Sequence, residues 1–426
     1  MPDMITRPPH IDRAARPIPK LHAAIRHAAI RHGVFPGFIR LMILAAAVIV
    51  GPLVFGPLVY VTSAQAAMTL QITPSITVSF EDGNLDVATG SGDMSGVTII
   101  EGGQTVLSAE TVTIKASGKP GNENWIIHYL QLKNAVFPAP RIFVNDLALR
   151  EVNAGLLVSD WRESEIANIM NDASFFSARN ISIEAENALI SIDEVTTLPI
   201  AFAEIAPGQR IATDAGLRIT GMTAMPVRDQ KHTSSLLRAM AARGFSDFTI
   251  DMELDMQMRV AGDDVHIFYN VSSAMRGLAE VEFALSMIAN RDVYADLLPS
   301  LADSKTDPGT ALEMSGLIAL EQAEMMVTDL GLGNILLAAA GEDEGISSDE
   351  LRRSVRMATV QRLTEIFPEN GPEIAVPVDA FLEQGGTLDL ALRPDVKVPF
   401  IKFVGLALLP DLALEALGFE IGHSPD

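Results

Sequence analysis

The chain of 426 residues contains no cysteine. This excludes disulfides, thiol nucleophiles and cysteine-ligated zinc or iron–sulfur centres. Aromatic residues make up only 6% of the sequence, and 54 acidic residues outnumber 31 basic ones, giving a formal net charge of −23. Such an acidic chain repels nucleic acid and anionic membrane surfaces, so a nucleic-acid partner is set aside.

Motifs of the common enzyme classes are also missing. The sequence has no G-x-S-x-G, no H-E-x-x-H, no Walker loop and no G-x-G-x-x-G after a strand. The four histidines beyond the N-terminal segment, His128, His232, His266 and His423, are scattered, with no pair at metal-ligand spacing. Solvent exposure accounts for His128 and His266, and a disordered C-terminus for His423. We therefore expect a protein that is not an enzyme and has no cofactor and no metal.

Two acidic stretches could suggest metal binding. In EDGNLD, Asp82, Asn84 and Asp86 have the spacing of the first EF-hand ligands, but Val87 and Asp93 stand where glycine and glutamate are required, so a hairpin turn is favoured. Asp251, Glu253 and Asp255 share one face of an expected strand. General acid–base chemistry is one interpretation of that triplet, and a solvated outer face that discourages edge pairing is the favoured one.

The N-terminus has the layout of an export segment. Residues 1–40 are basic, and residues 41–61 form an uncharged apolar run followed by TSAQAAM. Ala64-Gln65-Ala66 matches a signal-peptidase site, with cleavage expected after Ala66, whereas the apolar run of 21 residues is also long enough to span a bilayer. Either way the positive-inside rule predicts a periplasmic body, soluble after cleavage or anchored in the inner membrane through residues 41–61.

The body alternates strand-like and turn-like segments. Residues 68–160 and 178–222 are rich in β-branched residues and punctuated by glycine, asparagine and proline, which favours antiparallel strands. The clearest unit is 248–288, which predicts a three-strand meander with one apolar face. Helices are expected at 160–174, 233–243, 333–341 and 347–367, the last with a Ser347–Glu350 capping box and Pro368 at its end, while 316–329 is ambiguous between strand and helix.

The first strand of that meander, FTIDMELDMQMRV, alternates apolar and polar residues without a break. Methionine adapts to irregular apolar partners, so this face suits either a lipid groove or an ordinary core. The candidate lipid-binding residues are Ile250, Met252, Leu254, Met256 and Met258. Whether the helices at 333–341 and 347–367 cover this face decides between the two interpretations.

The C-terminal third resembles a known pattern. Asp329-Leu330-Gly331-Leu332, Phe381-Leu382, Gly386 with Thr387-Leu388, and Pro394 with Val398-Pro399 resemble a motif series in uncharacterised exported proteins of alphaproteobacteria. More distantly, a strand-rich, membrane-proximal body is similar to AsmA-like envelope proteins. That similarity implies a sheet that curls around acyl chains.

The sequence thus predicts a β-rich α+β fold: a long curved antiparallel meander with helices concentrated in the C-terminal third. Four regions are expected: a basic segment (1–40), a signal peptide or anchor (41–66), a β-rich periplasmic body (67–330), and a helix-and-strand part that packs on the same body (331–426). The expected function is binding or transfer of lipid through the apolar sheet face. A non-enzymatic envelope scaffold with a closed core, whose protein partners the sequence does not indicate, is the alternative.

Overall fold

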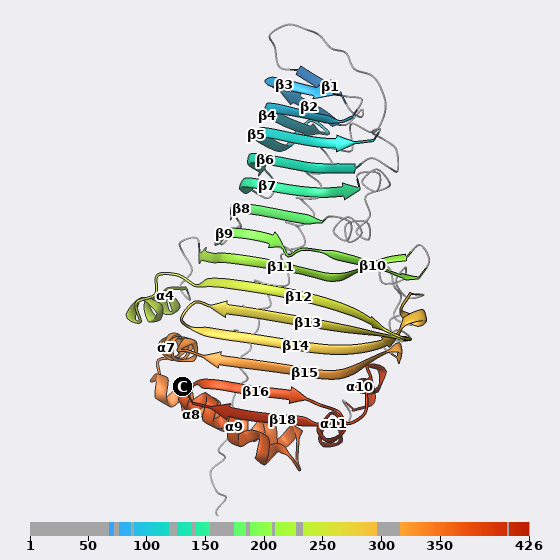
Figure 1. Ribbon diagram of the computed structural model, residues 1–426. Helices are drawn as coiled ribbons and strands as arrows, with labels where there is room; N and C mark the ends of the chain where they lie inside the picture. Colours follow the sequence, from blue (N-terminus) through green and yellow to red (C-terminus); the bar gives the residue numbers. More distant parts are fainter. Residues whose placement is uncertain are drawn as a thin grey trace, which may run out of the picture. The chain divides into compact units, whose positions relative to one another are not determined.

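Long runs of alternating apolar and polar residues fold into one antiparallel sheet (Figure 1). The computed structural model describes residues 68–71, 76–86, 89–118, 126–138, 141–153, 174–184, 188–206, 209–226, 233–295, 316–406 and 409–425. The chain divides into two units, Met1–Leu44 and Ala45–Asp426, and all described residues belong to the second. The export segment at 41–66 and all but Ser174 of the expected helix at 160–174 lie outside the described residues.

Within the described residues, the sheet contains 18 strands. They are β1 (Met68–Gln71), β2 (Ile76–Phe80), β3 (Asp82–Asp86), β4 (Ser91–Glu101), β5 (Gln104–Ser117), β6 (Ile126–Pro138), β7 (Arg141–Asn153), β8 (Phe175–Glu184), β9 (Ala188–Thr197), β10 (Ala201–Ala206), β11 (Gln209–Pro226), β12 (Thr249–Ala261), β13 (Asp264–Met275), β14 (Ala279–Asn290), β15 (Ile318–Asp329), β16 (Gly386–Leu392), β17 (Val398–Pro399) and β18 (Phe419–Ser424).

Each main strand pairs with the next along the chain, so the sheet is a meander. In three places two strands share one neighbour: β2 and β3 both pair with β4, β9 and β10 both pair with β11, and β16 and β17 both pair with β15. The predicted three-strand meander is confirmed as β12, β13 and β14, whose register runs without a break. The β-rich fold class is therefore confirmed.

The helices gather late in the chain, as the sequence predicts. They are α4 (Thr233–Ala242), α7 (Leu332–Glu344), α8 (Ser348–Ile366), α9 (Gly371–Gln384), α10 (Ile401–Leu406) and α11 (Pro410–Ala416). The capping box is confirmed, because the Ser347 hydroxyl accepts a hydrogen bond from the Glu350 amide at 3.2 Å. Within the described part of the chain, no helix is long and apolar enough to cross a membrane.

Two local predictions are wrong. EDGNLD is not a turn: Asp82–Asp86 forms β3, which pairs with Ser91–Ser95, and the chain turns afterwards at Gly90, which has a φ of +72°. His423 does not lie in a disordered terminus. It belongs to β18, where its Nε2 lies 2.8 Å from the Gly385 carbonyl oxygen and its ring meets Phe381 edge-on.

Candidate functional site

The five residues predicted to bind lipid share one face of β12, but they differ in how far they are buried. Met258 is buried in a core cluster with Val265 and Ile267. Met252 and Leu254 are 36% and 40% exposed, and Ile250 and Met256 are half-buried. The apolar face of β12 is therefore buried at Met258 and open along the middle of the strand, and it is exposed again at Val260, beside the β12–β13 turn.

The register of the sheet extends this open stretch across seven strands. Seven apolar residues lie opposite one another in a single row, hereafter the central row: Leu217, Leu254, Val271, Phe283, Met325, Leu390 and Ile421. Because neighbouring strands lie about 4.8 Å apart, the row is about 29 Å long. None of its members is buried, and Met325 is 38% exposed.

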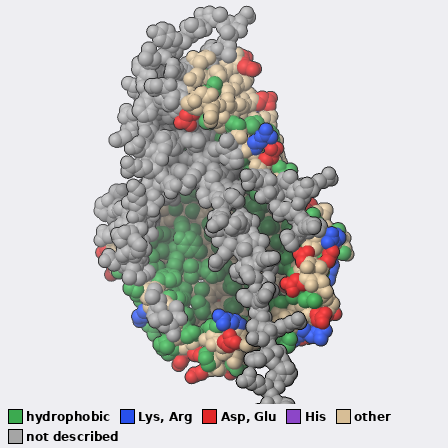
Figure 2. Space-filling view, turned by 180° about the vertical axis from the view of Figure 1, so that it is seen from behind, with side chains coloured by type: hydrophobic (Ala, Val, Ile, Leu, Met, Phe, Trp, Pro, Cys, Tyr) green, Lys and Arg blue, Asp and Glu red, His purple; other side chains and the backbone are tan. Residues whose placement is uncertain are grey.

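Packed clusters close the apolar face at both ends of the strands. At the end where β13 turns into β14, α4 and α7 meet the sheet in a cluster built on Met240, Leu278 and Ile335. At the opposite end, one cluster is built on Met258 and Val265, and α10 contributes to another built on Leu320, Val398 and Leu417. Seen from behind in Figure 2, hydrophobic side chains line a hollowed surface over the part of the sheet that includes β12–β16.

The helices expected at 333–341 and 347–367, which are α7 and α8, do not cover the central row. The α7 helix packs with α4 and with the end of the strands, and α8 packs against α7 and α9. The α9 helix contacts β16 and β18, where Phe381 meets His423 near the strand ends. The packing of α7, α8 and α9 is thus concentrated at one end of the strands, and the middle of the apolar face keeps partly exposed side chains.

The first half of the sheet provides an internal contrast. Its apolar face also forms rows across strands, such as Leu132 opposite Val112 and Leu147. These side chains are at most 1% exposed. The same alternating pattern therefore yields a tightly buried face over β5–β7 and a loosely covered one over β12–β16.

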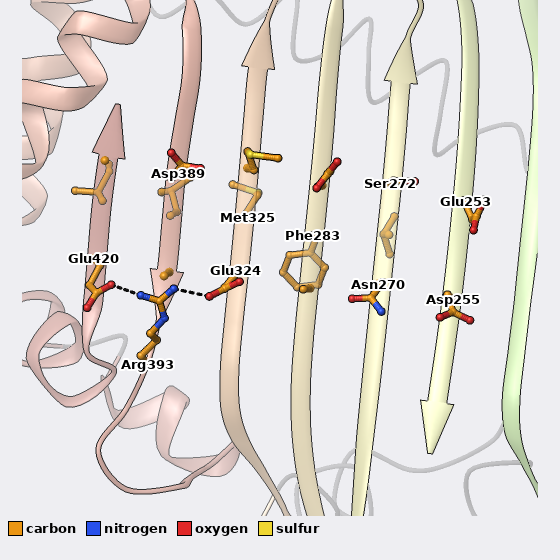
Figure 3. A pocket seen from close by; sticks show the side chains of 18 residues that line it. Glu253, Asp255, Asn270, Ser272, Phe283, Glu324, Met325, Asp389, Arg393 and Glu420 are labelled. Carbon is orange, nitrogen blue, oxygen red and sulfur yellow. Dashed lines mark hydrogen bonds and ion pairs between the residues drawn. The ribbon is translucent and has the colours of Figure 1, made fainter. Parts of the chain in front are cut away.

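The other face of the second half is polar and acidic (Figure 3). An open depression of about 840 Å³ is lined by six carboxylates of this face, Glu253, Asp255, Glu282, Glu324, Asp389 and Glu420, and also by five members of the central row, Val271, Phe283, Met325, Leu390 and Ile421. Arg393 bridges two of them, at 2.6 Å from Glu324 and 2.5 Å from Glu420, and its hydrogen bond lowers the pKa of Glu324. Arg218 pairs with Glu253 at 2.7 Å. Several of these acids are thus neutralised by arginines on the same face.

The acidic triplet of β12 lies on a solvated face, as the favoured interpretation expects, but it does not protect a sheet edge, because β12 pairs with β11 on one side and with β13 on the other. Asp251 accepts two hydrogen bonds from Arg276, at 2.7 and 2.9 Å, and Glu253 is paired with Arg218. Among the described residues, no group of three or more histidines or acids is arranged to hold a metal ion. The triplet forms part of a solvated, charge-paired face.

One cluster on the polar face joins a histidine, a serine and a glutamate. Glu321 lies 3.1 Å from His266 Nδ1 and accepts a hydrogen bond from the Ser286 hydroxyl at 3.0 Å. Burial opposes the charge on Glu321, but the two hydrogen bonds, together with the nearby charges of His266 and Lys397, outweigh it and lower the pKa of that carboxyl. The serine hydroxyl donates to the carboxylate rather than to the imidazole, so the cluster holds β13, β14 and β15 together and does not activate Ser286.

Sequence reasoning missed most of the open face, because it named candidates on β12 alone. The alternation of β14 places Val281 and Phe283 on the same face, and this signal was available. The sequence does not show that β16 and β18 extend this apolar face, because their place in the sheet depends on which strands pair across the long helical insertion between β15 and β16.

Comparison with known proteins adds one match. A family model described as "Uncharacterized protein" matches residues 271–424, which run from β13 through β18 and include α7–α11. No curated protein matches the chain. The matched segment carries five of the seven residues of the central row.

Proposed function

We propose that the protein binds the acyl chain of a lipid along the apolar face of β12–β16, as a periplasmic protein of the bacterial envelope. The observation that carries the proposal is the central row, an apolar row about 29 Å long in which no side chain is buried. Contiguous exposed apolar surface of this kind marks ligand grooves and interaction sites in soluble proteins.

The energetics favour a long apolar chain over a small ligand. Each CH₂ removed from water contributes about 0.8 kcal/mol, so ten of them contribute about 8 kcal/mol before the entropic cost of association. The exposed methionines, Met252 and Met325, have flexible and polarisable side chains that follow an irregular ligand surface. A scaffold with a closed core, the alternative function, would require the central row to be buried, as the rows of β5–β7 are.

The proposal predicts that a charge in the central row removes bound lipid. Leu254→Glu places a carboxylate on the open face, at a position exposed enough for the fold to tolerate it. The full chain and the variant are purified in the same detergent, extracted with organic solvent, and compared by quantitative mass spectrometry of the co-purifying lipid. We expect near-stoichiometric lipid with the natural chain and a several-fold loss with Leu254→Glu.

Leu237→Glu is the matched control, because Leu237 on α4 is also 40% exposed but lies outside the central row. It is expected to retain the lipid. Equal lipid in all three proteins would show that the lipid is held elsewhere, and no lipid above an unrelated control protein would favour the closed scaffold.

A further inference from the structure

A second, smaller cavity lies where the helices meet the sheet. Its volume is about 320 Å³, and its walls come from the ends of β14 and β15 and from α7, α8 and α9. Most of the lining is apolar, including Val327, Leu336, Leu337 and Phe381. This volume is at the low end of the range for small-molecule sites, so the cavity accommodates a small group rather than a whole lipid.

The cavity continues the apolar face. Val327 lies two residues beyond Met325 on β15 and pairs with Val281 on one side and Leu388 on the other. Since residues two apart in a strand point to the same face, Val327 extends the exposed surface of Met325 and Val281 into the cavity wall. A chain lying along the central row therefore has an adjoining end site among the helices.

One arginine lines this otherwise apolar cavity. Arg352 of α8 is half-buried, and its partners among the described residues are all uncharged: the Asn334 side-chain oxygen, the Leu382 carbonyl at 3.4 Å and the Glu383 carbonyl at 3.1 Å. Arg356, one turn further along α8, is held by Asp379 at 2.6 Å and by Glu383 at 2.7 Å. In so acidic a chain, a half-buried guanidinium with only neutral oxygen partners is available to an incoming anion.

The carboxylate that shares the cavity wall is already engaged. Asp329 accepts hydrogen bonds from the amides of Gly331, at 2.9 Å, and Gly333, at 3.1 Å, where α7 begins. The partial positive charge of the helix N-terminus offsets its negative charge. Arg352 thus supplies the positive charge with which an anionic headgroup would interact.

We propose that Arg352 binds the carboxylate of a fatty acid whose alkyl chain lies along the central row. This inference rests on the proposed function and names its ligand class. The planar guanidinium matches a carboxylate in a two-bond geometry, and the cavity has room for that group and a few methylenes.

The test compares dodecanoate with 1-dodecanol, which has the same chain and no charge. Calorimetric titration of the delipidated full chain is expected to show dodecanoate binding about tenfold more tightly or better, the usual difference for a hydrogen bond to a charged group. Arg352→Gln is expected to remove this preference by weakening dodecanoate alone. Arg352→Lys keeps the positive charge but loses the two-bond geometry of the guanidinium, and it is expected to retain part of the preference for dodecanoate.

A second variant guards against a folding defect, because Arg352 also binds the last carbonyls of α9. Asn334→Asp leaves the guanidinium in place and gives it an internal carboxylate partner, at a position near the start of α7 where an acid stabilises the helix. It is expected to weaken dodecanoate binding as Arg352→Gln does. Arg353→Gln, one residue along on the exposed side of α8, is the matched control and is expected to change neither ligand.

The outcomes separate the two proposals. Equal binding of dodecanoate and dodecanol, or equal weakening of both by Arg352→Gln and Asn334→Asp, overturns the role of Arg352 and leaves the lipid-binding face intact. Failure of the natural chain to bind either ligand overturns both.

Discussion

At the residue scale, a single carboxylate fixes the point where β11 bends against β12. Thr220 and Gly221 form a bulge opposite Asp251, between the pairs Ile219–Met252 and Met222–Ile250. Gly221 has a φ of +64°, and a Cβ there would come within 2.0 Å of the Asp193 carboxylate, so only glycine fits. Asp251 accepts the freed Gly221 amide at 2.7 Å, which sets the register that aligns Leu217 with Leu254.

The charge on Asp251 is predicted to stabilise the fold in a pH-dependent way. The hydrogen bonds from Arg276 and Gly221 outweigh burial and lower the pKa of Asp251 below its ordinary 3.8. A carboxyl whose folded pKa is lowered contributes stability that is present above the unfolded pKa and lost as pH falls through the folded pKa. We therefore expect Asp251→Asn to destabilise the protein near neutral pH, and the difference from the natural chain to vanish in acid.

Urea unfolding of both chains across this pH range measures the effect. Asp255→Asn is the matched control on the same strand face, because Asp255 accepts from the neutral Gln257 amide at 3.3 Å. A difference between Asp251→Asn and the natural chain that persists unchanged into acid would contradict the assignment.

At the element scale, α8 carries Arg352 into the cavity, and its start is fixed by a capping box. Ser347 has extended backbone angles and caps the helix, while Asp349 and Glu350 place negative charge in the first turn. Leu351 is buried against the neighbouring elements and orients the helix. The start of α8 therefore follows from local signals in the sequence, although these signals do not show that Arg352 faces the cavity.

Ser347→Ala is predicted to lower the free energy of unfolding by about 1 kcal/mol, the usual cost of removing an N-cap side chain. The Glu350 amide would lose its acceptor. Chemical denaturation measures the change, and Ser348→Ala, one residue along, leaves the cap in place. A loss that is equal in the two variants would mean that the cap contributes nothing specific.

The sequence predicted those elements best whose periodicity is unbroken. The β12 strand alternates throughout and was identified with its face, whereas residues 316–329 were ambiguous for a physical reason. A bulge makes Glu321 the extra residue, since Ser286 pairs with Gln322 and Met287 with Leu320. Leu320 and Ala323 are thereby spaced by three, as on a helix, although both belong to a strand.

The candidate site was predictable only in part. Met252 and Leu254 were found because their strand shows its apolar face locally. Arg352 was not found, because the cavity around it is formed by α7, the end of α9 and two strands more than twenty residues away in the chain. Nothing local to DELRRSV distinguishes Arg352 from Arg353, which faces solvent on the same helix.

At the scale of the whole described sheet, one pattern serves two purposes. Over β5–β7 the apolar face is sealed, with Val112, Leu130 and Leu132 at 0% exposure, and it stabilises the fold. Over β12–β16 the same pairing leaves Leu254 and Met325 exposed. The proposed function depends on this difference in covering rather than on any difference in strand chemistry.

The most direct test of this account is the solvent accessibility of the central row. Because the chain has no native cysteine, a thiol reagent labels only the cysteine that is introduced. Leu254→Cys and Met258→Cys are each introduced into the full chain, and labelling by a thiol reagent is followed after delipidation, with and without dodecanoate. We predict that Leu254→Cys labels rapidly and is protected by dodecanoate, while Met258→Cys, buried in its cluster, labels slowly in both conditions. Labelling of Leu254→Cys as slow as that of Met258→Cys, or rapid labelling that dodecanoate leaves unchanged, would contradict the account.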